Sequence, residues 1–101
     1  MAMTGKDRAA LRGEAHHLTA LVHVGHQGVT PTLVRTLDDA LRTRELVKVA
    51  LNRSVDANPK DLARELADAT GSEVIQVIGK TATFFRENPD LERKDGTPPW
   101  R

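Results

Sequence analysis

Two short signals fix where helices begin, and they constrain the fold of this chain more than any other feature. Thr30-Pro31 and Asn58-Pro59 each combine a side chain that caps a helix N-terminus with a proline at the first helical position, where a missing N–H costs nothing. A short run rich in β-branched residues comes after each of the two predicted helices, at 46–51 and at 74–78. Helices that alternate with such runs predict an α/β domain.

The remaining periodicities complete the order α-β-α-β-α-β-β. We expect helices at 4–18, at 31–44 and from 59 to a stop at Gly71, and strands at 20–24, 46–51, 74–78 and 81–86. Gly79-Lys80 between the last two strands predicts a hairpin with a two-residue type II′ turn. Right-handed crossovers then place the helices on the sheet, and the hairpin adds an antiparallel edge. The expected architecture is a two-layer α/β sandwich with a mixed four-stranded sheet.

Length and composition limit the class of protein. The chain has 101 residues and no cysteine, which predicts a single domain without disulfides or Cys-ligated zinc, as in a reducing cytoplasm. No apolar run approaches the ~18 residues that span a bilayer, and the N-terminus is polar within a few residues. We expect one domain at 4–87 and an extended or disordered tail at 88–101, which contains Thr97-Pro98-Pro99-Trp100.

A Gly-x-x-Gly loop joins the first predicted strand to the second predicted helix. Gly25 and Gly28 allow the backbone to approach a phosphate, because no Cβ holds it away. The N–H groups that follow Thr30 and the positive end of the helix dipole point the same way. A related loop contacts the sugar-phosphate backbone in KH domains. The alternative is a tight turn without a ligand. The loop lacks the Gly-Lys-Ser/Thr ending of a P-loop and the three spaced glycines of a dinucleotide fingerprint.

All four histidines flank this loop, at His16, His17, His23 and His26. Their spacing matches no standard zinc pattern, so we predict no metal and no cofactor. Two interpretations stay open, namely solvated polar residues or imidazoles that contact phosphates and bases.

The net charge of +1 comes from fifteen basic and fourteen acidic residues, so the distribution of charge matters more than its sum. Residues 56–68 carry four acidic and two basic side chains, which predicts an acidic side away from the loop. An ordinary mixed surface explains the pattern equally well. We expect the following basic residues near the loop: Arg8, Arg12, Arg35, Lys48, Lys80 and Arg86.

Catalysis finds little support in the sequence. Asp38-Asp39 is the only paired carboxylate, and adjacent residues of a helix point about 100° apart. Ser54 and Ser72 have no His-acid pair near them in sequence. We therefore predict that the protein is not an enzyme.

Four segments in a fixed order carry a resemblance to a known family. They are GEAHHL at 13–18, VGHQGVT at 24–30, ELVKV at 45–49, and QVIGKT at 76–81 with Phe85-Arg86 after it. Together they resemble the YhbY-like CRM-domain family (chloroplast RNA splicing and ribosome maturation domain), in its bacterial single-domain form, over about residues 4–87. The chain departs from the family pattern at Leu18-Thr19-Ala20, where Leu-Lys-Pro is common, and at Phe85, where Tyr is common.

The resemblance implies a monomeric RNA-binding module that associates with ribosomal RNA in precursors of the large ribosomal subunit and assists assembly. It implies a fold similar to the C-terminal domain of translation initiation factor three. The loop is then expected to meet the RNA backbone, and more distant basic side chains to add attraction. The predicted RNA-binding residues are Gly25, His26, Gln27, Gly28, Thr30, Arg8, Arg12, His16, Lys48, Lys80 and Arg86.

A protein–protein adaptor is the alternative function. In that case the exposed sheet face or the Pro-Pro-Trp tail would dock on a ribosomal or assembly protein, and RNA contact would be incidental.

Overall fold

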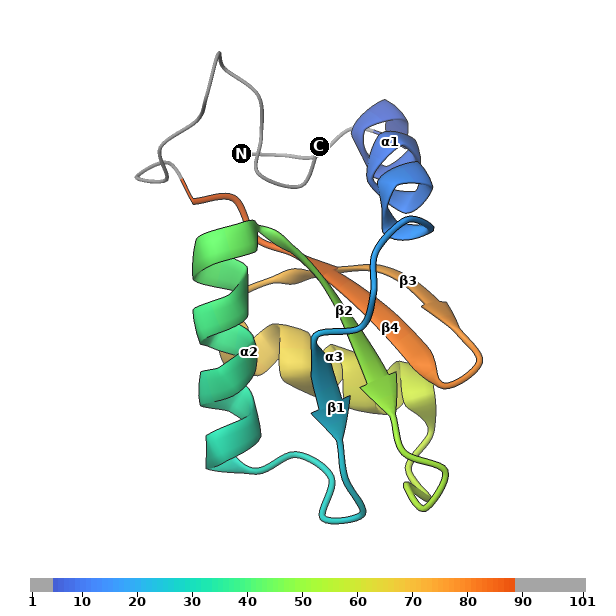
Figure 1. Ribbon diagram of the computed structural model, residues 1–101, viewed down its shortest axis with the longest axis vertical. Coiled ribbons are helices and arrows are strands. Elements are labelled where there is room, and N and C mark those ends of the chain that lie inside the picture. Colours follow the sequence, from blue (N-terminus) through green and yellow to red (C-terminus); the bar gives the residue numbers. More distant parts are fainter. Residues whose placement is uncertain (1–4, 89–101) are drawn as a thin grey trace.

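The computed structural model describes residues 5–88, which form three helices and four strands (Figure 1). The strands make one sheet in the order β1-β2-β4-β3, with β1 parallel to β2 and the other two pairs antiparallel. The predicted α/β class and mixed four-stranded sheet are confirmed; the tail expected from residue 88 lies, apart from Asn88, outside the described residues. The elements are α1 (Gly5–Ala15), β1 (Val22–Val24), α2 (Pro31–Arg44), β2 (Leu46–Leu51), α3 (Pro59–Thr70), β3 (Glu73–Ile78) and β4 (Thr81–Phe85).

Both helix-start signals act as expected. The Leu33 amide donates to Thr30 Oγ1 at 3.1 Å at the start of α2, and the Lys60 amide donates to Asn58 Oδ1 at 2.9 Å at the start of α3. Gly71 ends α3 in the left-handed conformation, with φ 66°. Local capping chemistry therefore sets the start of both helices and the end of α3.

The main core lies between the sheet and the pair α2 and α3. Val47 and Val49 alternate along β2 toward these helices, and Phe84 of β4 joins them from the next strand; all three are fully buried. Leu37 of α2 and Leu66 of α3 face them with no exposed surface. This packing joins the sheet and the pair α2 and α3 into the two layers that enclose the main core.

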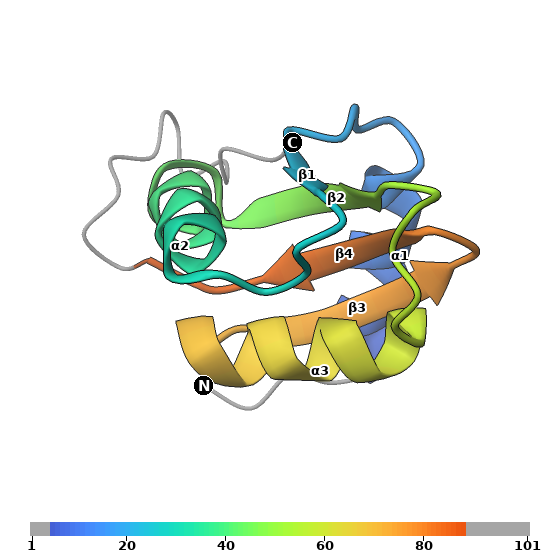
Figure 2. The same cartoon turned by 90° about the horizontal axis from the view of Figure 1, so that it is seen from below.

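Helix α1 packs on the other face of the sheet (Figure 2). Leu11 contacts Leu46 and Ile75 in a second, smaller apolar cluster. The helix ends at Ala15 and not at residue 18 as expected: the His17 amide donates to the Glu14 carbonyl at 3.0 Å and the Leu18 amide to the Ala15 carbonyl at 3.2 Å, which are turns tighter than an α-helix. The Lys48 ammonium donates to the Ala15 carbonyl at 3.4 Å and to the Leu18 carbonyl at 3.5 Å. A cation at the carbonyl end of a helix favours termination there.

Strand register defines two ends of the molecule. At one end Val24 pairs with Leu51, whose amide donates to the Lys80 carbonyl at 2.7 Å. We call this the loop end, because the chain leaves β1 there toward α2 (lower part of Figure 1). At the opposite end Leu46 pairs with Phe85, which pairs with Glu73. Helix α1 lies at that opposite end (Figure 1), and none of the described helices is long and apolar enough to cross a bilayer.

Candidate functional site

The Gly-x-x-Gly segment forms a tight turn at the loop end. The Gly28 amide donates to the Gly25 carbonyl at 3.0 Å, and Gly28 has φ 70°. His26 and Gln27 are exposed at the tip. The amides of His26, Gln27 and Val29 make no hydrogen bond within residues 5–88. Successive unpaired amides in a turn form a concavity that favours an anion.

The N-terminus of α2 adds less than the sequence predicts. Pro31 has no amide hydrogen, the Leu33 amide is taken by the Thr30 side chain, and the Val34 amide donates to the Thr30 carbonyl at 3.0 Å. Of the first turn, only the Thr32 amide lacks a partner among the described residues. The expectation that several N–H groups after Thr30 face a ligand is therefore wrong, because the proline and the cap remove them.

The two glycines of the loop differ in what the backbone demands of them. Gly28 lies in the left-handed region, which an L side chain adopts at a cost of roughly 1–2 kcal/mol. Gly25 has no positive φ, and a Cβ built on it meets no atom within 4 Å. Nothing in the described structure requires glycine at position 25, whereas close approach of a ligand would.

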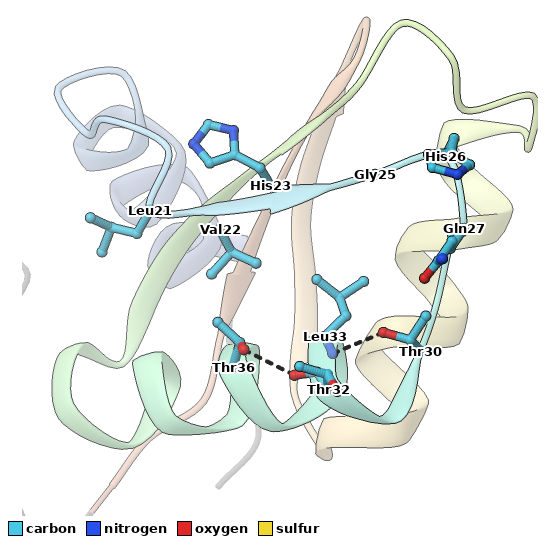
Figure 3. Close-up of a pocket in the computed structure, with 11 residues that line it drawn as sticks. Leu21, Val22, His23, Gly25, His26, Gln27, Thr30, Thr32, Leu33 and Thr36 are labelled. Atoms are coloured by element: carbon cyan, nitrogen blue, oxygen red, sulfur yellow. Dashed lines mark hydrogen bonds between the residues drawn. The ribbon is translucent and has the colours of Figure 1, made fainter.

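A groove of about 380 Å³ extends from this loop (Figure 3). One wall is the β1 segment from Leu21, and the other is the first two turns of α2 up to Thr36. Figure 3 shows Val22, Leu33 and Thr36 pointing toward one another, whereas His23 points to the other side of β1. The groove is thus apolar at its floor and polar along α2.

Two of the predicted RNA-binding arginines lie at the opposite end. Arg86, just after β4, donates to Asp38 Oδ1 at 2.6 Å and to the Thr70 carbonyl at 2.7 Å. Arg8 of α1 donates to Glu73 Oε2 at 2.9 Å. The expectation that these side chains surround the loop is wrong: α1 packs beside the start of β3, and antiparallel β4 carries Arg86 away from the loop end. Arg12, also on α1, is exposed at that distant end.

The two predicted lysines have separate positions. Lys48 caps α1 from the middle of β2, on the face opposite the main core. Lys80 lies at the loop end, where its ammonium donates to the Val55 carbonyl at 3.0 Å. Of these two, the structure brings only Lys80 near the turn.

Sequence reasoning missed a cation at the loop end. The Asn52 amide donates to the Val24 carbonyl at 2.9 Å, which fixes the segment after β2 beside the turn. Arg53 follows and is exposed. The available signal was the helical crossover from 20–24 to 46–51, because strands joined in this way run parallel and parallel strands end at the same edge of a sheet. Arg35, one turn into α2 beside Thr30, is also exposed.

The histidines do not gather into one site. His26 is in the turn, His23 is on β1, and His16 and His17 follow α1; all four are exposed. Within residues 5–88, no group of three or more His, Asp or Glu side chains is placed to hold a metal ion. The paired carboxylates also separate, since Asp38 pairs with Arg86 and Asp39 with Arg42.

Comparison with known proteins gives consistent matches in sequence and in structure. The family model for the CRS1 / YhbY (CRM) domain matches residues 3–86. "Probable RNA-binding protein YqeI" of Bacillus subtilis is 34% identical over 88 residues, which cover 87% of this chain and 92% of the relative. "Probable RNA-binding protein PA4753" of Pseudomonas aeruginosa is 33% identical over 89 residues, which cover 88% and 86% of the two chains.

A solved structure shares the fold. The solution structure of the hypothetical protein SAV1595 from Staphylococcus aureus superposes with a TM-score of 0.77 at 35% identity. The superposition covers 97% of this chain and all of that one. The turn and its groove therefore stand on a fold that this chain shares over nearly its whole length.

Proposed function

Because this chain belongs to the CRS1/YhbY (CRM) domain family, we propose that it binds RNA through the turn formed by Gly25, His26, Gln27 and Gly28. The observation that carries the proposal is the set of amides at His26, Gln27 and Val29 that have no partner among the described residues, with His26 and Gln27 exposed at the loop end of the sheet. Two curated relatives of similar length carry the name "probable RNA-binding protein", which supports RNA as the ligand.

The contact would be made mainly by the main chain. Amide hydrogens donate to phosphate oxygens, and such charge-assisted hydrogen bonds are about twice as strong as neutral ones. Gly25 leaves room for the phosphate to approach. Lys80, Arg53 and Arg35 would add attraction from the same end of the molecule. No catalytic step belongs to this proposal.

We propose that the RNA partner is ribosomal RNA in cytoplasmic precursors of the large ribosomal subunit, and that this protein has a role in the assembly of that subunit. This role follows from what the family resemblance implies, and a folded ribosomal RNA exposes single-stranded loops that a small domain can contact.

A pair of variants at one position tests RNA binding. Gln27→Asp places a negative charge among the amides, and Gln27→Asn places a neutral side chain of the same shape there. Gln27 is exposed and makes no hydrogen bond within the described residues, so both variants should keep the wild-type thermal unfolding midpoint. We expect Gln27→Asp to lose most RNA affinity and Gln27→Asn to lose little. Equal affinity of the two variants would refute the loop as the contact.

Sedimentation tests the assembly role. Tagged wild-type protein in a cell lysate at low salt should migrate with large-subunit precursors, and Gln27→Asp should stay with free proteins. If the wild type also stays with free proteins while it binds RNA in vitro, RNA binding stands and the assembly role falls.

A further inference from the structure

We propose that the groove beside the turn holds one unstacked base of a single-stranded RNA, an inference that rests on the RNA binding proposed above. All four residues of the turn, Gly25, His26, Gln27 and Gly28, also line the groove. A strand whose phosphate lies on the turn therefore passes its neighbouring nucleotide over the groove. The volume of about 380 Å³ falls in the range of small-ligand pockets.

The walls of the groove match the two kinds of surface that a base offers. Leu21 stands 48% exposed at the rim, and Val22 and Leu33 form the floor, so an apolar base face finds an apolar partner. Thr32 and Thr36 line the opposite wall. The Thr32 hydroxyl makes no hydrogen bond within residues 5–88, and the Thr36 hydroxyl donates to the Thr32 carbonyl at 2.9 Å and keeps its acceptor sites. These hydroxyls can meet the polar edge of a base.

The outer edge of β1 adds a main-chain donor and acceptor. The Val24 carbonyl accepts from the Asn52 amide at 2.9 Å, so the main chain at Val24 faces β2. Main-chain groups alternate in direction along a strand, so the N–H and C=O of His23, which also lines the groove, face outward. Strand β1 is the end of the sheet order, so within the described chain no strand pairs with that edge. A donor beside an acceptor is the pattern that the Watson–Crick edge of every base carries.

This pattern favours a single strand over a duplex. In a duplex the Watson–Crick edge is paired and the base faces are stacked, so neither surface is available to the groove. An extended peptide added to β1 is the competing occupant, but β1 has three residues only. So short an edge is a poor template for strand addition. Because the groove is continuous with the turn that we propose to bind the RNA backbone, an RNA base is the favoured occupant.

The experiment compares three labelled RNAs by fluorescence anisotropy. They are an unstructured single strand of mixed sequence, the same strand made of abasic nucleotides, and the fully paired duplex. All three carry the phosphates that the turn would contact. Thr36→Trp fills the groove, and Thr43→Trp is the matched control, since Thr43 is exposed on the same helix and its hydroxyl also bonds a carbonyl four residues back.

We expect the wild type to bind the normal single strand about tenfold more tightly than the abasic strand, as the loss of one base contact implies. Thr36→Trp should bring the normal strand down to the abasic affinity and leave the other two RNAs unchanged, and Thr43→Trp should behave as the wild type. If Thr36→Trp does not fold by circular dichroism, Thr32→Trp fills the same groove from the same wall.

Two results would overturn the inference while RNA binding stands. Equal wild-type affinity for the normal and abasic strands would show that no base is held. If Thr36→Trp binds all three RNAs as tightly as the wild type does, the groove does not hold a base and would serve another occupant, such as a protein segment. Absence of binding to every RNA would instead refute the proposed function itself.

Discussion

The glycine at position 25 offers the sharpest test of the proposed contact, because the fold does not need it. An added Cβ at Gly25 meets no atom within 4 Å, and φ is not positive. Replacing glycine by alanine at a compatible position stabilises a protein by about 0.4–1 kcal/mol, through the lower entropy of the unfolded chain. Gly25→Ala should therefore leave the free energy of unfolding unchanged or raise it slightly.

RNA affinity should respond in the opposite direction. A methyl group at position 25 would stand where a phosphate approaches the turn, and would cost at least one charge-assisted hydrogen bond. Such bonds contribute about 1.5–3 kcal/mol, which corresponds to a loss of roughly 10- to 100-fold in affinity. Stability and affinity thus separate in this variant.

Two further variants complete the assay. Gly28→Ala should lower stability by about 1–2 kcal/mol, because Gly28 has φ 70°. Gly13→Ala is the matched control: its Cβ also meets nothing, and it lies in α1 at the opposite end, so affinity should not change. Urea unfolding followed by circular dichroism gives the stabilities, and anisotropy with a labelled RNA gives the affinities. Gly25→Ala with wild-type affinity would refute the close approach of a phosphate at this position.

Three other predictions follow from the contacts. Arg53→Ala should reduce the steepness of log affinity against log salt by about 0.7–0.9, measured by a salt titration of RNA binding, and an unchanged slope would remove Arg53 from the interface. Arg86→Ala should lower the free energy of unfolding by about 1–3 kcal/mol, because the Thr70 carbonyl and the Asp38 carboxylate lose their donor. The RNA affinity of the folded variant should equal that of the wild type. A tenfold loss of affinity would show that Arg86 does contact the RNA. Phe84→Ala should cost about 3–5 kcal/mol in urea unfolding, since Phe84 is fully buried in the main core, and a smaller loss would mean that the core collapses around the cavity.

Local chemistry explains what could be predicted from the sequence. Thr30, Asn58 and Gly71 act within a few residues of themselves, so their roles are visible without tertiary structure. The end of α1 was misplaced for the opposite reason. The Ala15 carbonyl at this end accepts from the ammonium of Lys48, thirty-three residues away along the chain, a contact that no local pattern indicates.

The turn could be predicted from the sequence because it depends on local contacts, whereas the positions of the cations around it depend on tertiary structure. The Gly-x-x-Gly turn is closed by its own hydrogen bond, from Gly28 to Gly25, and could be recognised in the sequence. The cations near it depend on which strand ends meet. Arg53 approaches the turn only because β1 and β2 are parallel, whereas antiparallel β4 removes Arg86 to the far end.

This arrangement of cations has a consequence for how RNA is held. The sequence predicted five attracting basic residues, whereas the described structure places three, Lys80, Arg53 and Arg35, near the loop end. Neutralising three phosphates gives a salt slope of about −2 to −3, against about −4 for five. Binding that depends mostly on amide groups and on a base in the groove should therefore weaken only modestly with salt. A measured slope near −4 or steeper would mean that cations outside this set contact the RNA, and the turn would then share the ligand with a much larger surface.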